Sequence, residues 1–184
     1  MHAEAFAFVE RVSWDMDPKS ALELGAYDVN GNCRILFPSV TAWWGVDRRP
    51  GPNVDEVADA ETWRTKKKFD LVLCTEVLEH ATHPEAIVDT AYRALREGGH
   101  FVMTCATAGR APHSDDGVRG VEMQHYQNVS QTEMFDWLDN AGFEVKRLEV
   151  NHRACDLYAL AVRTLARAPL ASASGRAPSA QRRP

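Results

Sequence analysis

Acidic side chains follow three successive apolar segments of the chain, at the points where those segments end. These residues are Asp47, Asp59 and Glu76. Ligands of open α/β sheets bind beyond the carboxyl ends of the strands, so we expect the three carboxylates to face one cleft. Asp47 lies about twenty residues after Gly25, the spacing at which an acid accepts both hydroxyls of a ribose. Asp59 could accept a hydrogen bond from an adenine amino group.

Each of these residues alone has an ordinary explanation. Gly25 could be a simple turn glycine, and Asp47 could be an acid at a strand end that faces water. Arg48 could flank an adenosine or simply be solvated. Together, the three strand-end acids favour a nucleoside site. The predicted cofactor-binding residues are Glu23, Gly25, Asp28, Asn30, Gly31, Asp47, Arg48, Asp59, Ala60, Thr75 and Glu76.

The loop after the first apolar segment contains glycine at both ends. Gly25 and Gly31 let the backbone approach a ligand closely. Between them, Asp28 and Asn30 favour a tight turn, because their side chains bond nearby backbone groups. The loop lacks the middle glycine of a GxGxG run. A dinucleotide dehydrogenase needs such glycines to admit a pyrophosphate, so the loop disfavours that class.

Three histidines are candidates for a general base, because imidazole titrates near neutral pH. His80 lies just after a predicted strand, and it could equally be a helix-start residue that bonds backbone. His113 and His125 lie in a long irregular segment, and simple solvent exposure is the alternative for each.

A metal site is an alternative role for the acidic residues and the histidine that follow the predicted strand 69–74. Glu76, Glu79 and His80 would share one face if their segment were helical, with a fourth ligand from His113 or His125. Three ligand-type residues without a placed fourth do not make a site. We therefore predict no metal, with Glu76 over the cofactor and Glu79 capping locally.

The elements that position these residues alternate between strand and helix. This order predicts a Rossmann-like α/β fold: a mostly parallel sheet of seven strands, or slightly fewer, with helices on both faces. The last two strands are adjacent and predict an antiparallel C-terminal edge strand. The predicted helices are 3–15, 84–95 and 130–142, and the predicted strands are 21–24, 41–46, 54–60, 69–74, 100–105, 143–150 and 154–163.

Length and composition predict one domain over residues 1–163. Residues 106–129 are rich in His, Asp, Gly and Arg, and a loop this long is expected to contact substrate. Residues 164–184 are rich in Ala, Ser, Pro and Arg and are predicted to be disordered.

Charge and cysteine content argue against several classes of protein. The formal net charge is −5 although the final segment holds four arginines and no acids, so the body is acidic. An acidic body disfavours wide contact with a nucleic-acid backbone. The four cysteines form no CxxC pair, which disfavours a zinc ribbon or thioredoxin-like site. The sequence lacks a signal-peptide pattern and a membrane-length apolar run, so we expect a cytoplasmic monomer or homodimer that does not contact membranes.

These segments resemble class I S-adenosylmethionine-dependent methyltransferases of the branch often labelled type 11. Glu23-Leu24-Gly25 with Gly31 resembles their first motif, and Gly45-Val46-Asp47 resembles the end of their second strand. The most specific part is residues 69–101. The pattern Glu-x-x-Glu-His at residues 76–80 also resembles the metal site of some small-RNA 2′-O-methyltransferases and ubiquinone-pathway O-methyltransferases.

The resemblance implies methyl transfer from S-adenosylmethionine to an oxygen or nitrogen of a small-molecule or sugar-like acceptor. The alternatives are a nucleic-acid methyltransferase, which could use the Arg-rich tail as an anchor, and a non-catalytic adenosylmethionine-binding protein. A nicotinamide enzyme is a more distant alternative.

Overall fold

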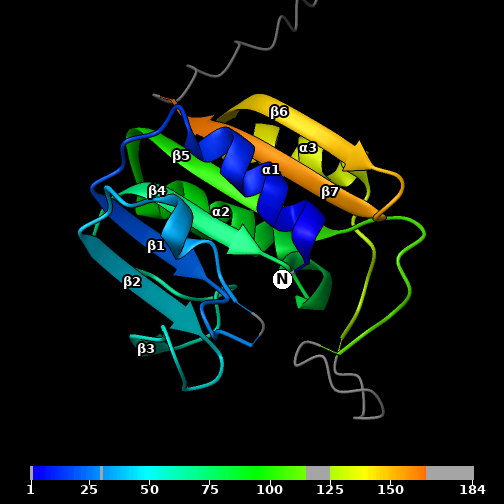
Figure 1. Ribbon diagram of the computed structural model, residues 1–184, viewed down its shortest axis with the longest axis horizontal. Coiled ribbons are helices and arrows are strands. Elements are labelled where there is room, and N and C mark those ends of the chain that lie inside the picture. Colours follow the sequence, from blue (N-terminus) through cyan, green and yellow to red (C-terminus); the bar gives the residue numbers. More distant parts are fainter. Residues whose placement is uncertain (1, 30, 115–124, 165–184) are drawn as a thin grey trace, which may run out of the picture.

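The computed structural model describes residues 2–29, 31–114 and 125–164. It contains a seven-stranded sheet in the order β3-β2-β1-β4-β5-β7-β6 (Figure 1). The pairs from β3 to β5 are parallel, and β7 runs antiparallel to both β5 and β6. The predicted fold is confirmed, and the antiparallel strand lies one place in from the edge. The strands are β1 Ser20–Leu24, β2 Ala42–Asp47, β3 Glu56–Val57, β4 Phe69–Thr75, β5 Leu95–Ala106, β6 Phe143–Asn151 and β7 Asp156–Arg163.

Helices cover both faces of this sheet. Helix α1 (Ala3–Ser13) crosses the front of the sheet over β5 and β7, and α2 (Pro84–Ala94) and α3 (Gln131–Ala141) pack behind it (Figure 1). The Ser130 hydroxyl accepts from the Glu133 N–H while the Glu133 carboxylate accepts from the Ser130 N–H, so the predicted capping box starts α3. Gly142 ends that helix in the left-handed region, at φ 96°.

Alternate residues of the central strands supply two apolar layers. Leu22, Val72 and Phe101 face α2 and α3, whereas Leu71 and Val102 face α1. All five side chains are fully buried. The strands therefore have apolar residues on both faces, as a parallel sheet covered by helices requires.

Strand β5 begins earlier than predicted. Helix α2 ends at Ala94, and β5 starts at Leu95 rather than His100. Leu95 pairs with Phe69, and an irregularity in the register follows before Leu71 pairs with His100. The glycines at positions 98 and 99, which lie between the predicted helix and the predicted strand, are thus part of the strand, because Leu95 already contributes to the ladder.

The segment between β1 and β4 contains one 3-10 turn, η1 (Arg34–Leu36), and no α-helix among its described residues, and none of the predicted helices lies there. A second 3-10 turn, η2 (Leu78–His80), follows β4. Asn30, part of the 106–129 loop and nearly all of the predicted tail lie outside the described residues. Within the described part of the chain, no helix combines the length and apolarity that crossing a bilayer would need.

Candidate functional site

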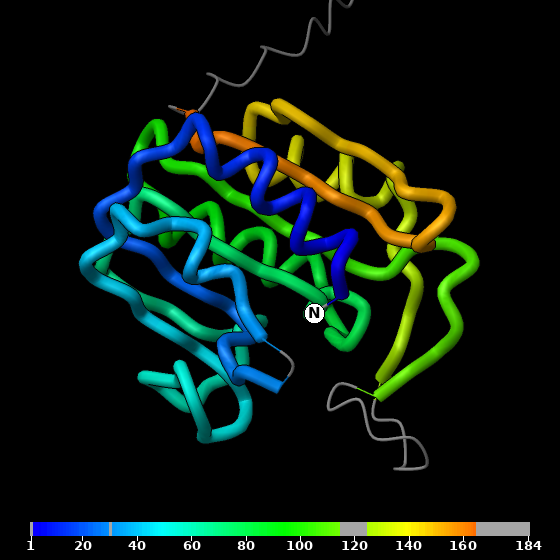
Figure 2. The backbone as a smooth tube through the Cα atoms, viewed as in Figure 1, coloured from blue at the N-terminus to red at the C-terminus, as the bar shows by residue number. Residues whose placement is uncertain are grey.

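A cleft of about 540 Å³ opens at the carboxyl ends of β1, β2 and β4. This volume lies within the range of small-molecule sites. The N-terminal end of α1 reaches the same end of the sheet, and residues 107–114 and 125–129 run beside it (Figure 2). The cleft is therefore bounded by strand ends on one side and by α1 and this loop on the other.

The structure brings the predicted cofactor residues together. Asn30 lies outside the described residues, and every other predicted cofactor residue lines the cleft: Glu23, Gly25, Asp28, Gly31, Asp47, Arg48, Asp59, Ala60, Thr75 and Glu76. Asp47 and Asp59 face the same space although they follow different strands. Their individual roles in binding stay predictions.

The glycine-ended loop turns sharply at Gly25 and again at Gly31. Gly25 has a φ of 76°, a left-handed conformation that glycine adopts without strain. The Asp28 Oδ1 accepts a hydrogen bond from the Gly31 N–H at 2.7 Å. A side chain–backbone turn at Asp28 therefore replaces the missing middle glycine.

The carboxylate of Asp47 is fixed by two backbone donors. Its Oδ2 accepts from the Tyr27 N–H at 3.0 Å, and its Oδ1 accepts from the Arg49 N–H at 2.9 Å. A carboxylate offers about four acceptor positions, so two bonds leave capacity for ligand hydroxyls. The bond from Tyr27 also ties the glycine-ended loop to the end of β2. Asp59 Oδ1 likewise accepts from the Glu61 N–H at 2.9 Å.

Glu23 forms a buried ion pair with Arg34, a residue that the sequence analysis missed. The Arg34 Nε donates to Glu23 Oε2 at 2.7 Å, and its NH2 group donates to the Asn53 carbonyl at 2.8 Å. The guanidinium carbon also lies 4.8 Å from the Trp43 ring centroid. Burial raises the pKa of Glu23, and the Arg34 charge opposes that rise. No periodic spacing links residues 23 and 34, so the sequence carried no signal for the pair.

Replacing Arg34 by methionine is expected to weaken binding of adenosylmethionine, the cofactor that the resemblance implies, by roughly tenfold, as for loss of a charge-assisted contact. Glu23 would lose its partner and its fixed position on the cleft floor. Isothermal calorimetry measures the change, and Arg64→Met, which alters an arginine outside the cleft, is the control. Equal affinities for Arg34→Met and the wild type would show that the pair does not position Glu23 for binding.

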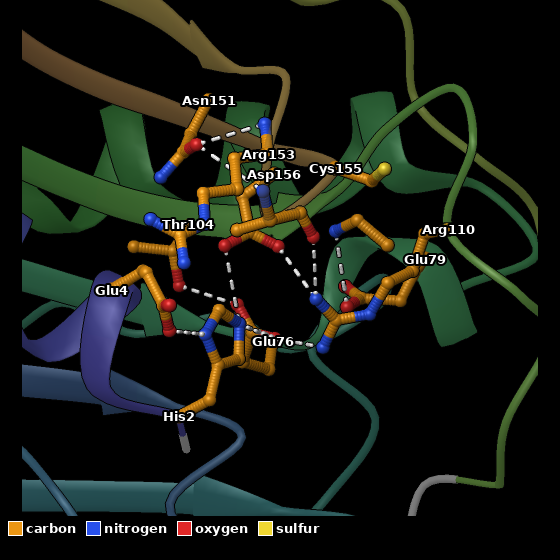
Figure 3. Close-up of polar contacts among 12 residues, drawn as sticks. His2, Glu4, Glu76, Glu79, Thr104, Arg110, Asn151, Arg153, Cys155 and Asp156 are labelled. Carbon is orange, nitrogen blue, oxygen red and sulfur yellow. Dashed lines mark hydrogen bonds and ion pairs between the residues drawn. The ribbon is translucent and has the colours of Figure 1, made fainter.

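Glu76 does not have the orientation that the metal alternative required. The residue has a φ of 57°, and only Leu78–His80 form a helical turn, so Glu76 does not share a helix face with Glu79 and His80. Its Oε1 accepts from the Thr104 hydroxyl at 2.8 Å. Its Oε2 lies 3.2 Å from the His2 Nε2 (Figure 3).

Two further residues surround this group. Asp156 is fully buried and accepts from Arg110 NH1 at 2.9 Å and from the Tyr158 hydroxyl at 2.8 Å. Arg110 NH2 lies 4.0 Å from Glu76 Oε2. His2, Arg110 and Asp156 were not predicted, because they come from the N-terminus, the long loop and β7.

A second cluster contains two of the predicted histidines. The rings of His80 and His113 meet edge to face at 5.0 Å, and both contact the Tyr126 ring. Both histidines line the cleft, with His80 buried and His113 half-buried. His125 is exposed and is not among the described residues that line the cleft. Base roles for these histidines stay predictions.

Glu79 lies beneath these rings and is fully buried. Its Oε1 accepts from the Ala106 N–H at 3.2 Å, so its contact reaches the end of β5 and is not the local cap that was predicted. Its Oε2 has no hydrogen-bond partner among the described residues. Burial and the nearby Glu76 raise the pKa of Glu79, which favours the protonated acid.

A Glu79→Gln variant is expected to gain thermal stability over the wild type as the pH rises. The folded state holds the Glu79 proton more tightly than the unfolded state, so wild-type stability falls above the ordinary glutamate pKa. Glutamine mimics the protonated acid. Melting temperatures between about pH 5 and pH 9 measure the difference, with the exposed Glu85→Gln as control. A difference that is constant with pH would contradict a raised pKa.

Donor atoms of Glu79, His80 and His113 all lie within 4.8 Å of one another. This set of one carboxylate and two imidazoles suits a divalent transition metal with open positions for water or substrate. This set differs from the alternative considered from the sequence, because Glu76 does not share a helix face with Glu79 and His80, whereas His113, one of the two candidate fourth ligands, lies beside His80.

Comparisons with known proteins identify the family and the fold of this chain. A family model described as a methyltransferase domain matches residues 1–148. The ubiquinone biosynthesis O-methyltransferase of Alkalilimnicola ehrlichii is 36% identical over 61 residues, 33% of this chain. The match spans only 22% of that enzyme.

Two solved structures share the fold at low identity. An S-adenosylmethionine-dependent methyltransferase from Clostridium acetobutylicum has a TM-score of 0.66 at 13% identity, covering 89% of this chain and 93% of that one. The second is the 1,6-didemethyltoxoflavin-N1-methyltransferase of Burkholderia thailandensis, solved with bound 1,6-didemethyltoxoflavin and S-adenosylhomocysteine. It has a TM-score of 0.63 at 17% identity, and the match covers 88% of this chain and 77% of that one.

The fold and the acid-lined cleft define the class I methyltransferase architecture, so the predicted resemblance is confirmed. The cofactor of this class is S-adenosylmethionine, as predicted. The chain belongs to the methyltransferase-domain family whose model matches it.

Proposed function

We propose that this protein transfers a methyl group from S-adenosylmethionine to an oxygen or nitrogen of a small-molecule or sugar-like acceptor. The observation that carries the proposal is the convergence of Glu23, Asp47 and Asp59 from three strand regions on one cleft of about 540 Å³. Carboxylates at these positions suit a ribose, an adenine amino group and a cationic amino acid moiety.

The reaction is a displacement at a methyl carbon bound to a sulfonium. The cofactor supplies the reactivity, and the protein has to align acceptor, methyl and sulfur. In this proposal, the strand ends hold the nucleoside. The opposite wall, which includes His80, Arg110 and His113, receives the acceptor, and Glu76 is proposed to border both the cofactor and the acceptor. An alcohol or ammonium acceptor must lose a proton, and we propose His80 or His113 as the base that takes it.

The proposed acceptor class has support from composition and relatives. The acidic body disfavours a long nucleic-acid contact. A nucleic-acid acceptor would instead give activity that falls steeply with salt. One relative is named for O-methylation and one structural neighbour for N1-methylation of a small molecule. Oxygen and nitrogen are therefore both proposed as the methylated atom of the acceptor. The cytoplasmic location and the choice between monomer and homodimer stay predictions.

Calorimetric titration with S-adenosylmethionine and NAD tests the proposal. We expect submillimolar binding of adenosylmethionine and none of NAD. The opposite pattern would overturn the assignment. Binding of adenosylmethionine without release of adenosylhomocysteine, across O- and N-nucleophile acceptors, would show a binding protein rather than an enzyme.

Complete chelation is expected to leave methyl transfer unchanged. The sulfonium of the cofactor supplies the reactivity of the proposed step, so alignment of the acceptor with the methyl group needs no metal. Turnover with and without chelator measures this, with metal analysis of the purified protein alongside. Loss of turnover that one divalent cation restores in the wild type, and not in His113→Ala, would show that the cluster of Glu79, His80 and His113 binds a working metal.

A further inference from the structure

The side chain of His2 lies in the cleft although the residue begins a helix. His2 is the N-cap of α1, but its ring makes no capping bond to the helix. The ring lines the cleft instead, with about a quarter of the side chain exposed. In Figure 3, it lies between Glu4, Glu76 and Asp156, at the end of the helix.

Both ring nitrogens of His2 face carboxylates. Nε2 lies 3.2 Å from Glu76 Oε2 and 3.2 Å from Asp156 Oδ2, and Nδ1 lies 3.3 Å from Glu4 Oε2. A neutral imidazole carries one N–H, whereas an imidazolium carries one on each nitrogen. Asp156 and Glu76 raise the pKa of His2 to about 10 against the opposing effect of burial, so the ring is a cation at neutral pH.

The carboxylates that hold His2 are distant from each other in the sequence and lie at the ends of two different strands. Glu76 follows β4 in a left-handed conformation that is unfavourable for a non-glycine residue. Asp156 starts β7 and is fully buried, with Arg110 on its other oxygen. A single ring therefore links α1 to two strand ends on the acceptor side of the cleft.

The contact also balances charge. Glu76 and Asp156 bring two buried or half-buried negative charges, and Arg110 brings one positive charge. Without the His2 cation, this group would keep an uncompensated carboxylate in a poorly solvated place, which is costly. His2 is thus required for an ionised Glu76 that stays in its observed position.

We propose that His2 is a positioning residue of the methyl-transfer site: its imidazolium holds Glu76, a predicted cofactor-binding residue, against the cleft and seats the first turn of α1 as the acceptor-side wall. The proposal rests on the proposed function and extends it to a residue that acts on the cofactor through Glu76. It makes the first turn of α1 part of the site.

Two substitutions separate charge from packing. His2→Gln keeps a polar side chain and removes the cation, whereas His2→Lys restores a cation that can reach both carboxylates. His83→Gln is the matched control. His83 is also a helix N-cap, and its Nδ1 lies 3.3 Å from Glu85, two residues on, but it is exposed and outside the cleft.

Calorimetry with S-adenosylmethionine gives the first readout. We expect His2→Gln to bind roughly tenfold more weakly, His2→Lys to bind within about threefold of the wild type, and His83→Gln to bind normally. Hydrogen exchange should show the first turn of α1 opening in His2→Gln while the rest of the helix stays protected.

Two results would overturn the proposal. One is wild-type affinity in His2→Gln. The other is equal weakening in His2→Lys and His2→Gln with a lowered melting temperature in both, which would make His2 a packing residue only. Failure of the wild type to bind adenosylmethionine would instead refute the proposed function, so the two failures are distinguishable.

Discussion

Replacing Asp47 by alanine is expected to weaken S-adenosylmethionine binding at least about 100-fold. The substitution removes the predicted acceptor of the ribose hydroxyls. It also frees the Tyr27 and Arg49 N–H groups, which the carboxylate now holds at 3.0 and 2.9 Å. Loss of a paired, partly buried acceptor costs about 1–3 kcal/mol, and here the ligand bonds and the loop are lost together.

Calorimetry on the folded variant measures this effect. Asp47→Asn is the informative partner, because its single amide oxygen can still accept one backbone bond but not hold both ribose hydroxyls. We expect an intermediate affinity. Asp15→Ala, which removes an exposed acid between α1 and β1, should bind normally. Tight binding by Asp47→Ala would refute the ribose assignment and with it the predicted orientation of the cofactor.

The strand-end acids could be predicted because their signal is local. Asp47 and Asp59 each close an apolar segment, and the rule that parallel strands end at one edge of a sheet brings them together. The structure agrees, because both line one cleft. The capping box at Ser130 was predictable for the same reason: its two bonds join residues three positions apart.

The acceptor-side residues could not be predicted because their contacts are not local. His2 and Arg110 both contact the carboxylates of Glu76 and Asp156. These residues lie far apart in the sequence, and their spacing forms no periodic pattern. The metal alternative required a helical register for residues 76–80, and this register does not form. The left-handed backbone at Glu76 breaks that register and turns its side chain toward α1. Sequence spacing alone could not show this.

Gly45 supports the cofactor side of the cleft by a close backbone approach. A Cβ at this position would lie 1.8 Å from the Asn53 carbonyl oxygen and 2.8 Å from the Ala26 Cβ. The Gly45 N–H also donates to Asp55 Oδ2 at 2.7 Å. The loop that follows Asp47 therefore folds back onto β2, and only glycine leaves room for it.

Gly45→Ala is expected to destabilise the protein by about 3 kcal/mol, at the upper end for overpacking, because the obstructing atom belongs to the backbone. This corresponds to a melting temperature lower by roughly 6–12 °C. Adenosylmethionine binding should weaken as well. The displaced loop contacts the glycine-ended loop, through the Asp28 N–H on the Pro52 carbonyl and through Gly51 beside the Tyr27 ring.

Gly98→Ala is the matched control for this substitution. Gly98 has a φ of 75°, but a Cβ there would meet no atom within 4 Å. Its replacement therefore introduces backbone strain of about 1 kcal/mol without a clash, far from the cleft. Thermal melts and adenosylmethionine titrations of both variants separate the two effects. If Gly45→Ala is no less stable than Gly98→Ala and binds the cofactor normally, the loop does not depend on the close approach at β2.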